Sequence, residues 1–173
     1  MNKTIFERGM TFVADNVFHI EKSSQYAELD DRLKTVEFVR AKNDKLMFVE
    51  AKSSFPNSSN MSPNPKKENK TGDELFREEI SEICDKFIHS LNLYSAVSVG
   101  ITADRFPPDY EPANKVSLMF VLVINGFEKS LCGEIERALK QRFRESVCIS
   151  QIWKPDVCVM NHATAKERHL IAG

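Results

Sequence analysis

The fold is decided by residues 34–54, KTVEFVRAKNDKLMFVEAKSS. Two runs rich in β-branched and aromatic residues flank Asn43-Asp44, a pairing of strand signals with a turn signal that is typical of a β-hairpin. The pattern predicts strands over 34–41 and 45–53, joined by a turn over 42–45.

The turn also predicts which side chains share a face. If Asn43-Asp44 form its tip, Glu37 lies opposite Glu50 and Thr35 lies opposite Lys52. Opposed residues of an antiparallel pair share a face, as do residues two apart on one strand. Glu37, Glu50 and Lys52 are therefore expected together, and a slip of one residue would move them to opposite faces.

This trio has a chemical interpretation. Two opposed carboxylates repel unless a positive group lies between them, and Mg²⁺ is commonly held by one or two carboxylates, waters and a phosphate. The neighbouring ammonium of Lys52 can position or deprotonate a metal-bound water and counter charge on a phosphate. The residues predict phosphodiester hydrolysis. The competing interpretation is a strand face on which Glu37 and Glu50 flank Lys52 as a salt-bridge cluster.

The rest of the chain predicts an α/β protein with a mixed sheet flanked by helices, its antiparallel start joined to a parallel βαβ finish. A capping box at Thr71 and Glu74 opens the clearest helical stripe. The expected elements are a strand or hairpin over 11–21, a helical turn within 23–33, a flexible Ser/Pro/Asn loop over 53–72, helices over 71–99, 128–145 and 163–170, and strands over 116–124 and 157–160.

Composition limits the function classes. The 173 residues are expected to form a single domain, 1–173. Because 24 basic residues face 25 acidic ones, a polyanionic partner needs a local basic patch. The four cysteines lack zinc-site spacing. No signal-peptide pattern opens the chain, and its longest apolar run, 118–124, is too short for a membrane span. The expectation is a cytoplasmic protein without a membrane partner.

Leu46 to Ser54, LMFVEAKSS, with Glu37 about a dozen residues upstream and a helix downstream, resembles the PD-(D/E)XK, restriction-endonuclease-like, nuclease superfamily. The later VLVING strand, 121–126, is similar to one in small bacterial members, and the similarity spans about 11–171. The resemblance implies a restriction-endonuclease-like fold and Mg²⁺- or Mn²⁺-dependent nuclease activity. It also implies a nucleic-acid partner, with DNA favoured. Because the chain is small, specificity beyond the nucleic-acid backbone is expected to need a homodimer or a protein partner. Some members are inactive, so an interaction module is the alternative.

The resemblance assigns roles by position. Glu37 takes the place of the first acid, Glu50 the second and Lys52 the catalytic lysine, with the Ala51 carbonyl as a further metal ligand. The usual Pro-Asp is missing, so Asp30 and Asp31 are rivals of Glu37. Many members add an acid from an earlier helix, for which Glu21 or Glu28 are the candidates.

Two further groups of charges have open interpretations. Lys66, Lys67 and Lys70, in the loop after the Glu-x-Lys strand, are candidates for nucleic-acid backbone contacts or ordinary charges of a solvated linker. Glu79, Glu82 and Lys86 lie roughly opposite the apolar stripe of the long helix, so they are expected to be solvated. Glu79 keeps a second interpretation, because in this superfamily that helix packs beside the active site.

Overall fold

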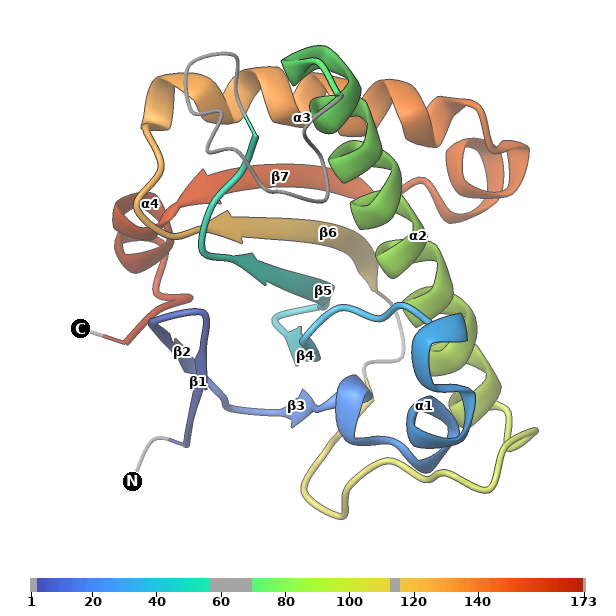
Figure 1. Ribbon diagram of the computed structural model, residues 1–173. Coiled ribbons are helices and arrows are strands. Elements are labelled where there is room, and N and C mark those ends of the chain that lie inside the picture. Colours follow the sequence, from blue (N-terminus) through green and yellow to red (C-terminus); the bar gives the residue numbers. More distant parts are fainter. Residues whose placement is uncertain (1–2, 57–69, 113–115, 173) are drawn as a thin grey trace.

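The hairpin expected around Asn43-Asp44 forms the middle of a five-stranded sheet (Figure 1). The computed structural model describes residues 3–56, 70–112 and 116–172, except for the side chain of Asp31. The sheet order is β3 (Val17–Phe18), β4 (Phe38–Lys42), β5 (Lys45–Lys52), β6 (Ser117–Ile124) and β7 (Asp156–Asn161). The first three strands run antiparallel, and β5, β6 and β7 run parallel, which confirms the predicted mixed α/β sheet.

The register of the hairpin is the expected one, with Val39 paired to Phe48. Asn43-Asp44 have φ values of 49° and 59°, the left-handed conformation that a tight two-residue hairpin turn requires at both positions. Strand β4 begins later than predicted, because its regular pairing with β5 starts only at Phe38, one residue after Glu37. The Glu37 N–H still donates to the Val49 carbonyl at 3.1 Å, so this acid stays attached to β5.

Two helices cover one face of the sheet: α2 (Gly72–Ser98) and α3 (Lys129–Arg144). Both are close to their predicted bounds. The capping box is present. The Thr71 side chain accepts a hydrogen bond from the Glu74 N–H, and the Glu74 side chain accepts one from the Thr71 N–H. Phe87 of α2 stacks on Phe120 of β6 with ring centroids 4.6 Å apart, so the apolar stripe of α2 is docked on the sheet.

The opposite face packs against elements from the two ends of the chain. These are β1 (Thr4–Glu7) and β2 (Met10–Val13), which form a separate two-stranded sheet, and α4 (His162–Glu167) (Figure 1). Alternate residues of β5 and β6, such as Val49 and Val123, enter this second apolar cluster. Both faces of the central strands are buried, as the continuous apolar run of β6 predicts.

Other segments differ from expectation. The strand or hairpin predicted over 11–21 is divided among β2, β3 and a 3-10 turn, Ile20–Lys22. The helical turn expected within 23–33 is present as helix α1 (Ser24–Leu29), which a second 3-10 turn (Asp30–Arg32) follows. A π-helical turn (Cys148–Trp153), which was not predicted, precedes β7. The loop predicted over 53–72 lies mostly outside the described residues. No helix in the described ranges is long and apolar enough to cross a membrane.

Candidate functional site

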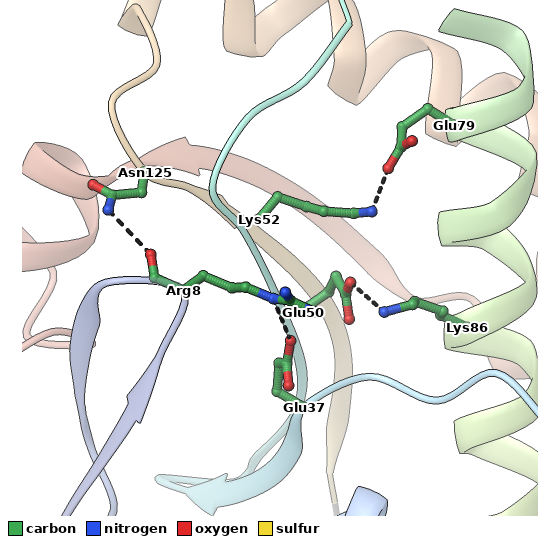
Figure 2. A network of polar contacts seen from close by, with 7 residues as sticks. All are labelled: Arg8, Glu37, Glu50, Lys52, Glu79, Lys86 and Asn125. Carbon is green, nitrogen blue, oxygen red and sulfur yellow. Dashed lines mark hydrogen bonds and ion pairs between the residues drawn. The ribbon is translucent and has the colours of Figure 1, made fainter. Parts of the chain in front are cut away.

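The residues of the predicted site meet where β5 ends and β4 begins, beneath α2 (Figure 2). Glu50 and Lys52 alternate with Val49 and Ala51 along β5, so they point to the face covered by α2 rather than to the second apolar cluster. Glu50 is completely buried and Glu37 is 3% exposed. The structure therefore confirms that Glu37 and Glu50 are close neighbours on a shielded part of the sheet.

Glu50 is neutralised by a lysine from α2. The Lys86 ammonium donates to Glu50 Oε1 at 2.7 Å, whereas Oε2 is buried and has no hydrogen-bond partner among residues 3–56, 70–112 and 116–172. Burial raises the pKa of Glu50 to about 7; Lys86 opposes this rise and the charge of Glu37 adds to it. Burial alone would lower the pKa of Lys86, but Glu50 and the other site acids outweigh it, so that pKa is raised and Lys86 stays charged.

Glu37 lies between an acid and a base. Burial, followed by the charge of Glu37 and a hydrogen bond to it, raises the pKa of Glu21 to about 8. On the other side, Arg8 Nε forms an ion pair with Glu37 Oε1 at 3.6 Å, beyond hydrogen-bond distance. That oxygen is buried and has no hydrogen-bond partner in the part of the chain that the structure describes.

Lys52 makes its contact with α2 rather than across the hairpin. Its ammonium forms an ion pair with Glu79, and both side chains are mostly shielded, with 19% and 15% exposed. Figure 2 shows that this pair lies beside the Glu50–Lys86 pair. Lys52 thus remains close to the two strand acids but is held by a third carboxylate.

The prediction that Glu79 and Lys86 are solvated is wrong. Both lie one turn from Ile83, a fully buried residue of the apolar stripe, so they border the stripe and reach the sheet beneath it. Their spacing of four and three residues from Ile83 was the sequence signal that could have placed them beside the apolar stripe.

Arg8 and Asn125 were not anticipated as part of this network. The Asn125 amide donates to the Arg8 carbonyl at 3.1 Å, which brings the turn between β1 and β2 to the end of β6 (Figure 2). The β1 strand was not predicted, and without it no pattern places Arg8 near Glu37.

The remaining candidates are less central. Glu28 and Asp30 are exposed, and the side chain of Asp31 lies outside the described part. Ala51 has its methyl group in the second apolar cluster. Lys70 is half-exposed and pairs with Glu78 of α2, while Lys66 and Lys67 lie outside the described residues.

The chemistry of the donors fits a hard divalent cation. Glu37 Oε1 and Glu50 Oε2 are buried carboxylate oxygens to which no described residue donates a hydrogen bond, and Mg²⁺ and Mn²⁺ prefer oxygen ligands. No group of three or more His, Cys, Asp or Glu side chains in the described ranges is arranged as a ready metal site. Glu50 faces Lys86 instead, and Glu37 faces Glu21 and Arg8.

Comparison with known proteins adds no assignment. No protein-family model matches the sequence, and no curated protein or solved structure matches it significantly. The functional argument therefore rests on the side chains of this site.

Proposed function

We propose that this chain is a Mg²⁺- or Mn²⁺-dependent nuclease with a restriction-endonuclease-like fold, acting on nucleic acid, with DNA favoured. The supporting observation is a pair of buried acids, Glu37 and Glu50, beside Lys52. Each acid has a carboxylate oxygen that lacks a hydrogen-bond partner in the described part of the chain. Buried carboxylate oxygens that lack a hydrogen bond are costly, and a role as metal ligands would account for two of them at one place.

Each residue has a role in this proposal. Glu37 and Glu50 hold the metal, together with the Ala51 carbonyl and Glu21. A bound Mg²⁺ lowers the pKa of its water and polarises the phosphate. Lys52 supports the attacking water and counters the charge that develops on the phosphate, while Glu79 keeps its ammonium at the site.

Lys86 favours a second candidate function. Its ammonium already neutralises Glu50, so the burial of this acid does not require a metal. A protein in which Lys86 permanently takes this place would be a catalytically inactive interaction module with the same fold. Metal binding separates the two proposals.

A cleavage assay tests the nuclease. Plasmid, linear duplex, single-stranded DNA and RNA are incubated with wild type and Lys52→Ala in Mg²⁺, Mn²⁺ or EDTA. We expect metal-dependent cleavage that falls at least about a hundredfold in Lys52→Ala, a loss typical of removing one stabilising group. Lys45→Ala is the matched control, because Lys45 is an exposed lysine at the other end of β5, and it should cleave normally.

Calorimetric titration with Mg²⁺ or Mn²⁺ completes the test. Metal affinity lost in Glu50→Ala supports the nuclease. Folded wild-type protein that neither binds metal nor cleaves any of the four substrates contradicts it and favours the interaction module.

A further inference from the structure

The turn between β1 and β2 is built to hold one arginine at a fixed place. Arg8 and Gly9 have φ values of 52° and 78°, the conformation of a tight two-residue hairpin turn. A Cβ on Gly9 would lie only 2.9 Å from the Asn125 amide nitrogen, so the turn packs directly on the Asn125 side chain. Glycine is favoured here by the backbone conformation, and a larger residue would have to displace the Asn125 side chain.

Asn125 connects this turn to the end of β5, the strand that carries Glu50 and Lys52. Its side-chain amide donates to the Arg8 carbonyl at 3.1 Å, and its backbone N–H donates to the Lys52 carbonyl at 2.8 Å. One residue therefore links the backbones of Arg8 and Lys52, although these two lie far apart in the sequence. The hairpin turn cannot move from the site without breaking this link.

The Arg8 side chain bridges the buried acids and the solvent. It is 54% exposed, whereas the Glu37 side chain is 2% exposed, and the two are separated by 3.6 Å. At that distance the two side chains form an ion pair but no hydrogen bond, and Glu37 Oε1 has no hydrogen-bond partner among the described residues. The guanidinium therefore lies at the rim of the site, and its N–H groups donate no hydrogen bond to Glu37.

We propose that Arg8 binds a phosphate of the nucleic-acid backbone next to the bond that is cut, an inference that rests on the proposed function. Guanidinium groups match the geometry of phosphate oxygens through paired donors. A cation bound by Glu37 removes the electrostatic attraction that draws Arg8 inward, while the backbone anchor keeps the side chain at the rim. Arg8 is then positioned for a substrate that approaches from solvent.

The competing role is purely intramolecular: Arg8 would only offset the charge of Glu37. The two roles predict different effects of an Arg8 substitution on nucleic-acid binding and on Mg²⁺ binding. Loss of a phosphate contact weakens nucleic-acid binding and reduces its salt dependence. Loss of a charge-neutralising group leaves nucleic-acid binding unchanged and strengthens Mg²⁺ binding, because a competing cation has been removed.

Binding is measured without cleavage, in the Lys52→Ala background. Fluorescence anisotropy of a short labelled DNA duplex with Mg²⁺, over a series of NaCl concentrations, compares this protein with added Arg8→Ala, Arg8→Lys or Arg144→Ala. We expect Arg8→Ala to raise Kd about three- to tenfold and to reduce the slope of log Kd against log salt by about one. Arg8→Lys should restore the slope and only part of the affinity.

Arg144→Ala is the matched control, because Arg144 is an exposed arginine at the end of α3, beside the beginning of β7, and it should change neither quantity. If Arg8→Ala and Arg8→Lys both leave the slope unchanged while calorimetry shows tighter Mg²⁺ binding, the inference about Arg8 fails and the nuclease proposal stands. If neither wild type nor the Lys52→Ala protein binds duplex DNA, single-stranded DNA or RNA, both fail.

Discussion

Glu50 has the most demanding surroundings of the site acids. It is fully buried, its charge is opposed by the ammonium groups of Lys86 and Lys52, and one of its oxygens has no hydrogen-bond partner within the described ranges. Burial raises its pKa to about 7, so the folded protein binds a proton at Glu50 more tightly than the unfolded chain does. Stability must therefore depend on pH near neutrality.

The sign of this dependence follows from proton linkage. Between the ordinary pKa of 4.5 and the raised value of about 7, the folded state holds more protons at Glu50, so the free energy of unfolding falls as pH rises. In EDTA we expect wild type to lose up to about 3 kcal/mol relative to Glu50→Gln between pH 4 and pH 8. Urea denaturation at several pH values measures this difference.

Three other titrations do not reverse that comparison. Burial raises the pKa of Glu21 to about 8 and the charge of Glu50 adds to the rise, so Glu50→Gln reduces it and changes the difference in the same direction. Burial lowers the pKa of His19, which makes stability rise with pH, but His19 is present in both proteins. Glu50→Gln leaves Lys86 buried without its main counter-ion, which lowers the Lys86 pKa and changes the difference in the same direction. Parallel stability curves for wild type and Glu50→Gln would show that the pKa of Glu50 is not raised.

At the scale of elements, the turn and capping signals in the sequence predicted the secondary structure around them. Asn43-Asp44 and the alternation beside it were sufficient for the β4–β5 hairpin and its register, because a two-residue turn allows only one pairing. The capping box and apolar stripe were sufficient for α2. These two elements placed Glu37, Glu50 and Lys52 correctly.

The partners of these residues were not predictable in the same way. Lys86 and Glu79 reach the sheet only because α2 docks at a particular rotation, which depends on the whole core and not on the helix sequence alone. The β1–β2 hairpin has strands of four residues, too short for a clear alternation, so Arg8 was missed. The residues that were not predicted as part of the site are therefore those that reach it only through tertiary packing.

A pair of glycine substitutions tests the hairpin turn as an element. Gly9→Ala places a side chain at φ 78° and against Asn125, so we expect a loss of about 1–2 kcal/mol in the free energy of unfolding. Gly133 lies within α3 with no atom within 4 Å of an added Cβ, so Gly133→Ala should stabilise by about 0.5–1 kcal/mol. Urea denaturation distinguishes them; equal effects would contradict the close packing of the turn on Asn125.

At the scale of the molecule, the site joins three distant segments. The N-terminal hairpin provides Arg8, the central strands provide Glu37, Glu50 and Lys52, and α2 provides the two residues that pair with β5 (Figure 2). Such a site exists only in the folded protein, because the unfolded chain separates these segments. A ligand that binds it must therefore stabilise the whole fold.

Thermal unfolding with and without divalent ions uses this linkage. Mg²⁺ or Mn²⁺ at a hundred times its Kd should add about 2.7 kcal/mol to the free energy of unfolding, which raises the midpoint by about 5–10 °C. Glu37→Gln and Glu50→Gln should lose this rise, whereas Glu134→Gln, which changes an exposed acid of α3, should keep it. Buffers without divalent ions are matched in ionic strength with NaCl to exclude general screening.

The pH dependence of the same experiment separates this site from other acids on the surface. Cation binding at Glu50 requires its carboxyl group to lose a proton, so the metal-induced rise should increase from pH 6 to pH 8, across a pKa of about 7. Exposed carboxylates are already ionised at pH 6, so ions bound to them give a rise that does not change over this range. A rise that is equal at both pH values, or that persists in Glu50→Gln, would place the ion elsewhere. No rise for wild type would leave Lys86 as the resident cation of Glu50, as the interaction module requires.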